Sequence, residues 1–180
     1  MLRALEPAAP EFAFVGRSNV GKSSLLNALV GRPLARVSAT PGKTQLMNAY
    51  RLPTFWLLDL PGYGFAKADR SSRAAYRVML EQLLRERESL SGVVWLLDIR
   101  HPPSADDAEF QGLLTQAGRS VLVVLTKADK LPYAQRAKAA AERARELGVD
   151  LEQIQIVSTR DKLGINELAE SLLAAAGGMA

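Results

Sequence analysis

Short apolar runs alternate along this chain with stretches that repeat an apolar residue every three or four positions. Runs of the first kind predict strands, and stretches of the second kind predict amphipathic helices. We expect strands at Phe12–Gly16, Gln45–Leu52, Phe55–Leu58, Val93–Leu97, Ser120–Leu125 and Gln153–Val157. We expect helices at Lys22–Val30, Ser72–Glu88, Ala105–Ala117, Ala134–Leu147 and along the apolar stripe Ile165–Ala176. Arg32–Thr44 has no clear period and is expected to be a long loop.

This alternation predicts an α/β fold. Val121–Leu125 is continuously apolar, which is typical of a strand that is buried on both faces. A two-residue gap separates the second and third predicted strands, which indicates a hairpin. We therefore expect a three-layer, doubly wound, mostly parallel sheet with one antiparallel edge strand. Residues 1–10 are interpreted as a short N-terminal lead, and residues 11–180 as a single domain. Ser104 and Asp107 have the spacing of a capping box at a helix start.

The composition limits the class of protein and the compartment that we expect. The 180 residues include no cysteine, which excludes disulfides and thiolate metal sites. No apolar run approaches the roughly 20 residues that a membrane-spanning helix needs. The first residues lack the apolar segment of a signal peptide, so we expect a cytoplasmic protein without a membrane partner.

The pattern Gly, four residues, Gly-Lys-Ser occurs at Gly16–Ser23, between a predicted strand and a predicted helix. In that context it predicts a phosphate-binding loop. Gly16 and Gly21 allow a tight turn, and the exposed N–H groups at the helix start favour an anion. Lys22 can reach the outer phosphates, and the Ser23 hydroxyl can bind magnesium. The alternative is a chance Gly-rich turn, which the flanking elements disfavour.

Two further segments fit the same nucleotide. Asp59 ends a predicted strand and can hold magnesium directly or through water, and Gly62 can bring its N–H close to a γ-phosphate. Alone, this segment would be an ordinary strand-ending turn. Thr44, at the end of the long loop, can complete the magnesium shell when a γ-phosphate is bound. Thr40 is the rival candidate for that role.

Thr126–Asp129 follows another predicted strand and suggests which base is bound. The Asp129 carboxylate can accept hydrogen bonds from the N1–H and 2-amino groups of guanine, and adenine lacks that pair of donors. Lys127 can lie along the base and support the phosphate loop. Without the phosphate loop we would interpret this segment as a helix cap. The backbone of Ser158 and Thr159 can contact the guanine carbonyl, although such pairs also begin ordinary loops.

These motifs resemble the EngB (YihA/YsxC) family of ribosome-biogenesis GTP-binding proteins, within the TrmE–Era–EngA–EngB–septin-like group. The residues that match are Gly16–Ser24, Thr40–Gln45, Asp59–Ala66 and Thr126–Asp129. The resemblance implies a Ras-like P-loop GTPase fold, binding of GTP and GDP, and slow hydrolysis with Mg²⁺. It also implies a role in large ribosomal subunit assembly, with an effect on cell division and septation. The family usually has a longer stretch before its first strand, and Ser-Ser where this chain has Ser158-Thr159.

The candidate site residues fall into four groups. The nucleotide-binding candidates are Gly16, Arg17, Ser18, Asn19, Val20, Gly21, Lys22, Ser23, Ser24, Gly42, Lys43, Thr44, Gln45, Leu46, Asp59, Leu60, Pro61, Gly62, Thr126, Lys127, Ala128, Asp129, Val157, Ser158 and Thr159. The magnesium candidates are Ser23, Thr44 and Asp59, and the catalytic candidates are Lys22, Asn19 and Thr44. In related GTPases an Asn at the position of Asn19 helps to hold a potassium ion beside the phosphates. Tyr63 stands where many GTPases have a water-orienting Gln, so we expect weak intrinsic hydrolysis that potassium or a partner stimulates.

Residues 32–77 contain eight basic and two acidic residues, whereas the rest of the chain is nearly balanced and the net charge is +4. This segment is either a solvated face that also offsets nucleotide charge or a surface that faces RNA. Arg70, Arg73 and Arg77 are the candidates for contact with ribosomal RNA phosphates. We expect a monomer without a DNA partner, and we expect Trp56 and Trp95 to pack in the core.

Three functions remain open. The first is a GTPase switch in ribosome assembly, which the motifs favour. The second is a nucleotide-dependent RNA- or ribosome-binding module whose hydrolysis is unimportant. The third is an ATP-using kinase or ATPase built on the same loop, against which Asp129 argues.

Overall fold

The computed structural model describes residues 5, 8–31, 38–39, 47–64 and 70–177. Its strands are β1 Glu11–Gly16, β2 Ser38–Ala39, β3 Asn48–Arg51, β4 Trp56–Asp59, β5 Leu90–Asp98, β6 Val121–Thr126 and β7 Ile154–Ile156. Its helices are α1 Lys22–Val30, α2 Arg70–Glu86, α3 Ala105–Ala117, α4 Tyr133–Leu147 and α5 Ile165–Gly177, with short 3₁₀ helices at Ala128–Lys130 and Leu151–Gln153.

Within the described residues the strands form one seven-stranded sheet in the order β2-β3-β4-β1-β5-β6-β7. The strands β4, β1, β5, β6 and β7 are parallel to one another. The hairpin partner β3 is antiparallel to β4, and the two-residue β2 is antiparallel to β3 on its outer side. The predicted mostly parallel sheet with an antiparallel strand is therefore confirmed. The prediction that this strand lies at the sheet edge is wrong, because β2, within the expected loop Arg32–Thr44, pairs on its outer side.

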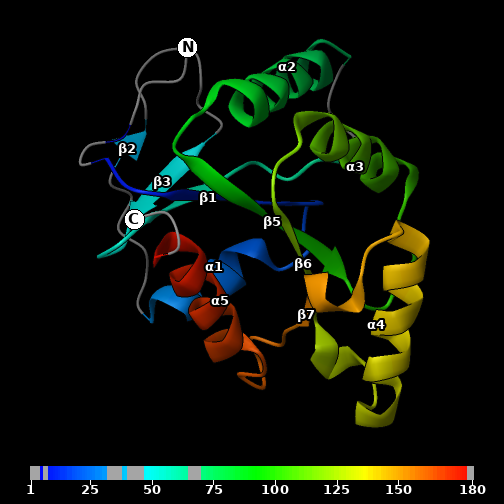
Figure 1. Ribbon diagram of the computed structural model, residues 1–180. Coiled ribbons are helices and arrows are strands. Elements are labelled where there is room, and N and C mark those ends of the chain that lie inside the picture. The colour runs from blue at the N-terminus through cyan, green and yellow to red at the C-terminus, as the bar shows by residue number, and fades with distance from the viewer. Residues whose placement is uncertain (1–4, 6–7, 32–37, 40–46, 65–69, 178–180) are drawn as a thin grey trace.

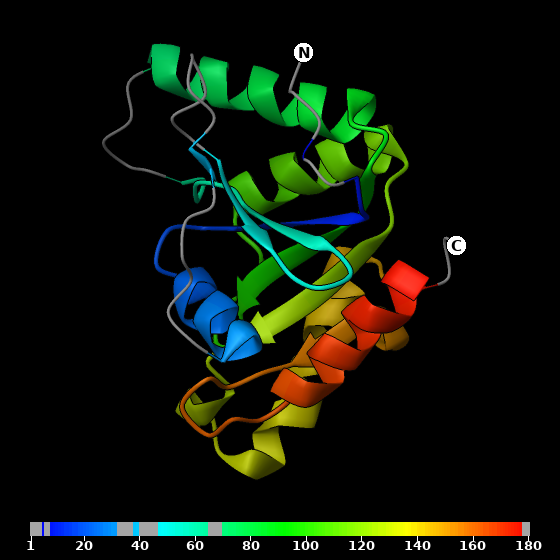
Figure 2. The ribbon, with the colours of Figure 1, turned by 90° about the vertical axis from the view of Figure 1, so that its left-hand side faces the viewer.

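Helices cover both faces of this sheet (Figure 1). On one face, apolar side chains of α2, α3 and α4 belong to the same core cluster as Ala13 and Val15 of β1. On the other face, side chains of α1 and α5 pack against Phe12 and Phe14. The turned view in Figure 2 shows α2 and α3 lying beside each other on one side of the strands and α1 and α5 on the other. Successive residues of β1 thus face opposite layers, which explains why all six are buried.

The predicted elements are found with small shifts of their ends. Helix α2 begins two residues earlier than predicted, and β5 is longer at both ends. The predicted capping box is present, because the Ser104 hydroxyl accepts a hydrogen bond from the Asp107 N–H while the Asp107 carboxylate accepts one from the Ser104 N–H. Both tryptophans are buried, as predicted. Among the described residues, no helix is long and apolar enough to cross a membrane.

The carboxyl ends of the parallel strands meet at one edge of the sheet. Gly16, Asp59, Asp98 and Thr126 end the neighbouring strands β1, β4, β5 and β6. In open sheets of this kind, ligands bind outside these ends. The topology therefore brings the predicted phosphate, metal and base segments to the same edge.

Candidate nucleotide-binding site

The predicted phosphate loop connects β1 to α1 and lines a cavity of about 550 Å³. Asn19 and Gly21 both have positive φ, 65° and 104°, which wraps the chain tightly before the helix begins. The cavity is lined by the loop residues together with Gly62 and Lys127: Arg17, Ser18, Asn19, Val20, Gly21, Lys22, Ser23, Ser24, Gly62 and Lys127. The first-turn N–H groups of α1 and the Lys22 ammonium make this end of α1 a favourable place for an anion.

Thr126, the last residue of β6, and Lys127, which follows it, both contact this loop. The Thr126 hydroxyl donates to the Val20 carbonyl at 2.7 Å, and it also lies 3.2 Å from the Leu97 carbonyl. The Lys127 ammonium donates to the Asn19 carbonyl at 2.7 Å. These contacts link the segment predicted to bind the base directly to the segment predicted to bind phosphates.

Asp98, which the sequence interpretation missed, holds Lys127 from the opposite side. Its carboxylate lies 3.2 Å from the Lys127 ammonium and accepts two hydrogen bonds from the Arg100 guanidinium, at 2.9 and 2.7 Å. Burial alone would raise the pKa of Asp98, but hydrogen bonds from Arg100 and the charge of Lys127 lower it to about 2. Asp98 ends a buried strand beside the predicted base segment, and that position is the signal that could have identified it.

The predicted magnesium ligand Asp59 lies at the phosphate loop, where it forms an ion pair with Lys22. Both side chains are largely buried, and β4 is fixed in register beside β1 by the pairing of Asp59 with Phe14. Ser23 lines the same cavity. A hydroxyl and a carboxylate are hard oxygen donors of the kind that Mg²⁺ prefers, so this donor set fits the ion. Within the described residues, no group of three or more His, Asp or Glu side chains forms a metal cluster.

Gly62 lies directly against the phosphate loop. A Cβ added to it would be 2.8 Å from the Ser18 nitrogen and 3.1 Å from the Arg17 carbonyl carbon, so every larger residue would displace the loop. The next residue is tied to the loop by its backbone, because the Ser18 N–H donates to the Tyr63 carbonyl and the Tyr63 N–H donates to the Gly16 carbonyl, both at 3.1 Å. The segment after β4 therefore forms one wall of the cavity.

The Tyr63 side chain points into the core and is 8% exposed. Its hydroxyl accepts a hydrogen bond from the Trp95 indole N–H and donates one to the Asp107 carboxylate, both at 2.7 Å. Its ring stacks on Phe110 with a centroid distance of 5.1 Å. Burial, reinforced by the charge of Asp107, raises the pKa of Tyr63. Sequence reasoning missed this network, although the capping box had already singled out Asp107.

The base-recognition candidate Asp129 lies in the 3₁₀ helix that follows β6. The Ser158 hydroxyl donates to its carboxylate at 2.9 Å and itself accepts from the Asp161 N–H at 3.1 Å. The Ala128 N–H donates to the Val157 carbonyl at 3.2 Å, which joins the two predicted base segments. Burial alone would raise the pKa of Asp129, but the Ser158 hydrogen bond and nearby cations lower it. The carboxylate is therefore ionised and fixed in orientation near neutral pH.

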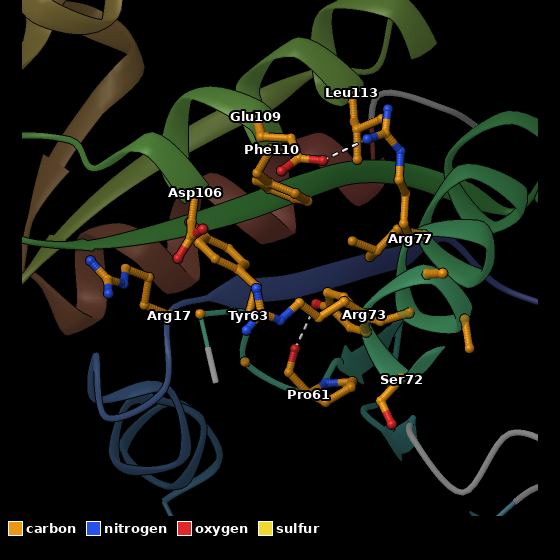
Figure 3. A pocket seen from close by; sticks show the side chains of 16 residues that line it. Arg17, Pro61, Tyr63, Ser72, Arg73, Arg77, Asp106, Glu109, Phe110 and Leu113 are labelled. Carbon is orange, nitrogen blue, oxygen red and sulfur yellow. Dashed lines mark hydrogen bonds and ion pairs between the residues drawn. The ribbon is translucent and has the colours of Figure 1, made fainter. Parts of the chain in front are cut away.

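The arginines predicted to contact RNA lie on α2, which comes after the β4 segment in the chain. Arg77 is about half exposed and forms ion pairs with Glu81 at 3.0 Å and Glu109 at 2.6 Å, and these carboxylates raise its pKa. Arg73 lines a second cavity, of about 1080 Å³, between α2 and α3 (Figure 3). Arg70 is the first residue of α2, and its side chain lies outside the described structure.

Several candidates fall outside the described residues. These are Thr40, Gly42, Lys43 and Thr44 from the long predicted loop, and Gln45 and Leu46 from the start of the strand predicted after it. Their contributions to nucleotide and magnesium binding stay predictions. The remaining candidates, from the phosphate loop and the ends of β4, β6 and β7, lie along the same edge of the sheet.

The strand order, the helices on both faces and a phosphate loop after β1 define a P-loop GTPase of the Ras-like type. Residues 11–127 match the model of a family described as 50S ribosome-binding GTPase. The probable GTP-binding protein EngB of Desulfitobacterium hafniense strain Y51 is 44% identical over 170 residues, covering 93% of this chain and 85% of that protein. Its counterpart in Anaeromyxobacter sp. strain K is 48% identical over 153 residues, covering 79% and 71%. The chain belongs to the EngB family of GTP-binding proteins.

Solved structures support the fold. A crystal structure of a probable GTP-binding protein engB has a TM-score of 0.75 at 19% identity and covers 93% of this chain and 99% of that one. Era in complex with MgGDPNP and 16S ribosomal RNA nucleotides has a TM-score of 0.66 at 25% identity and covers 93% of this chain and 57% of that one.

Proposed function

We propose that this protein is a monomeric cytoplasmic switch that binds GTP and GDP and hydrolyses GTP slowly. In this proposal it acts in assembly of the large ribosomal subunit and is needed for normal cell division and septation. Residues 11–180 serve as a single GTP-binding domain. The main support is the position of Asp129, whose ionised carboxylate lies at the same sheet edge as the phosphate loop and is joined to it through Lys127.

Guanine selection rests on the lone pairs that Asp129 keeps available. One carboxylate oxygen accepts from Ser158, and a carboxylate has about four acceptor sites, so guanine N1–H and 2-amino donors can still be accepted. Adenine has no donors at these positions, so it would displace water from the ionised carboxylate without replacing the lost hydrogen bonds, which is costly. The ATP-using alternative is therefore disfavoured.

Calorimetry tests this selection. The wild type is titrated with GDP, a non-hydrolysable GTP analogue and ATP in the presence of magnesium, beside Asp129→Ala and the control Asp150→Ala. We expect guanine nucleotides alone to bind, and Asp129→Ala to lose that binding while the control keeps it. Equal binding of ATP, or unchanged binding by Asp129→Ala, would refute the assignment.

The residues around the phosphate loop determine how far hydrolysis can proceed. Lys22 can leave the Asp59 carboxylate and neutralise phosphate oxygens. Ser23, Asp59 and, in the predicted loop, Thr44 would hold Mg²⁺, which would supply neutralisation of phosphate charge. The Tyr63 hydroxyl is engaged by Trp95 and Asp107 and cannot orient an attacking water. We therefore expect slow intrinsic turnover.

Potassium is the proposed aid to hydrolysis. Asn19 lines the phosphate cavity, and its backbone is fixed there by a positive φ and by the hydrogen bond from Lys127 to its carbonyl. Turnover is compared in potassium and sodium for the wild type and Asn19→Ala. We expect potassium to accelerate the wild type and not the variant. Equal rates in the two salts would count against this role and leave a ribosomal partner as the activator.

Ribosome binding is supported by the family description and by the basic residues of α2. Arg70, Arg73 and Arg77 are proposed to contact ribosomal RNA phosphates, and Arg77 would exchange its ion pairs with Glu81 and Glu109 for that contact. Co-sedimentation with 50S subunits is measured over a salt series for Arg73→Glu and for the control Arg85→Glu near the far end of α2. We expect weaker binding and a flatter salt dependence for Arg73→Glu alone. Identical curves for the two variants would remove α2 from the interface.

A second candidate function is a nucleotide-dependent ribosome- or RNA-binding module in which hydrolysis is unimportant. The buried Tyr63 side chain favours it, because the segment after β4 offers no water-orienting group at that position. Multiple-turnover assays with ribosomal subunits separate the two functions. Stimulated turnover supports the switch, and nucleotide-dependent binding without turnover supports the module.

A further inference from the structure

The Pro61–Gly62 peptide is held between two anchored residues. On one side, the Leu60 N–H donates to the Phe14 carbonyl at 3.1 Å. On the other, the Tyr63 N–H donates to the Gly16 carbonyl at 3.1 Å, and the Tyr63 side chain is fixed in the core. Because both neighbours are tied to β1, rotation of the chain here is confined to the peptide between them.

Pro–Gly is the residue pair that permits such a rotation. Turning a peptide changes ψ of the first residue and φ of the second. The proline ring fixes φ but leaves ψ free, and glycine accepts either sign of φ. Turns with Pro and Gly at their centre accordingly occur with the central peptide in either of two opposite orientations.

One side chain holds this peptide in a single orientation. The Tyr76 hydroxyl, from the second turn of α2, donates to the Pro61 carbonyl at 2.7 Å (dashed line beside Pro61 in Figure 3). Tyr76 is half-buried and packs against the apolar side chains beneath α2. The contact lies in the 1080 Å³ cavity between α2 and α3, whereas Gly62 also lines the cavity of the phosphate loop.

Because the peptide is trans, its two polar groups face different cavities. The C=O and N–H of one peptide point in opposite directions. A Pro61 carbonyl held toward Tyr76 therefore turns the Gly62 N–H away from α2. A hydrogen bond to the carbonyl also polarises the peptide and strengthens its N–H as a donor.

We propose that Tyr76 is a positioning residue that holds the Gly62 N–H ready for the γ-phosphate and so favours GTP over GDP. This inference rests on the proposed function, because it assigns the γ-phosphate as the partner of Gly62. Tyr76 itself touches no nucleotide in this scheme. It couples α2, and a partner that binds the surface of α2, to the Pro61–Gly62 peptide beside the phosphate loop.

The test removes the hydroxyl and keeps the ring. Tyr76→Phe and the control Tyr133→Phe, whose tyrosine is 83% exposed on α4, are titrated with GDP and with the β,γ-imido analogue of GTP in magnesium. We expect Tyr76→Phe to weaken the analogue about three- to tenfold and to change GDP affinity by less than about twofold. Equal weakening of both nucleotides, or no change in either, would overturn the proposal.

Two further measurements keep this test separate from the proposed function. In nucleotide-free protein, the Gly62 amide resonance should broaden or double in Tyr76→Phe and stay unchanged in Tyr133→Phe, and an unchanged resonance in both contradicts the restraint.

Failure of the wild type to bind either guanine nucleotide would instead reject the proposed function. A crystal structure of the wild type with the imido analogue needs no variant: a Pro61 carbonyl that faces the γ-phosphate would overturn the proposal, and a retained Tyr76 contact supports it.

Discussion

Replacing Tyr63 with Phe removes one hydroxyl from the centre of a buried network. That hydroxyl accepts from the Trp95 indole and donates to the Asp107 carboxylate, both at 2.7 Å. The other Asp107 oxygen accepts from the backbone N–H and hydroxyl of Ser104 at 2.7 and 2.6 Å. The substitution therefore leaves the stacking on Phe110 in place and deletes two hydrogen bonds at once.

The magnitude follows from what is left unpaired. The Trp95 N–H stays buried without its acceptor, which costs about 1–3 kcal/mol. Loss of a hydrogen bond to a carboxylate costs about 1.5–3 kcal/mol, and deleting the buried hydroxyl offsets part of both costs. We expect Tyr63→Phe to lower the free energy of unfolding by about 2–4 kcal/mol. In a chain of this size, that corresponds to a fall in the melting temperature of roughly 5–12 °C.

Urea unfolding monitored by tryptophan fluorescence, with differential scanning calorimetry, measures this loss. Tyr133→Phe is the matched control, because its hydroxyl is exposed on α4, and we expect its stability to stay within about 0.5 kcal/mol of the wild type. Trp95→Phe should lose a similar amount, and the double variant should lose less than the sum, because the two side chains share one hydrogen bond. Additive losses, or a Tyr63→Phe variant as stable as the control, would refute the network as a source of stability.

Three other predictions concern the site. Ser158→Ala should raise the pKa of Asp129 and weaken GDP binding about three- to tenfold by calorimetry, and unchanged affinity would argue against this orienting role. The low pKa of Asp98, about 2 against an ordinary 3.8, contributes stability above about pH 4 that is lost as pH falls toward 2. Asp98→Asn should therefore lower the free energy of unfolding by about 1 kcal/mol at pH 7 and make it depend less on pH in acid. The same acid dependence in the wild type and the variant would contradict the pairing. Gly62→Ala should weaken GDP and GTP-analogue binding at least about tenfold, because its Cβ would meet Ser18, and wild-type affinity would show that the loop yields freely.

The sequence predicted the elements well where one local signal was strong. Lys22–Val30 and Ala105–Ala117 match their predicted bounds, because glycines or a capping box mark their ends. Helix α2 begins before the predicted Ser72, since its first turn has no apolar periodicity to show the start. The two-residue β2 could not be predicted, because so short a strand exists through its pairing with β3.

The site was predicted as motifs and not as contacts. Motifs named the phosphate and base segments and predicted that Lys127 supports the phosphate loop, but they did not identify the Asn19 carbonyl, 108 positions away, as its partner. The roles of Asp98 and Tyr76 likewise depend on which strands are neighbours and on how α2 lies over the sheet. Long-range pairs of this kind are set by topology, which local patterns do not encode.

Tyr63 connects the stability of the fold to its proposed switching. A water-orienting side chain must be free at the phosphate end, whereas Tyr63 is fixed through Asp107 to the start of α3. The cavity wall is thus fixed at residue 63. In our proposal the Pro61–Gly62 peptide is the part that can rotate, and the hydrogen bond from Tyr76 restrains it. If this division is correct, Tyr63→Phe should lower stability with little change in the ratio of GTP-analogue to GDP affinity. Tyr76→Phe should change that ratio with a smaller loss of stability. Two tyrosines that anchor the same turn, Tyr63 within it and Tyr76 from α2, would then have separable effects. Finding the same effect for both would show that the turn moves as one unit.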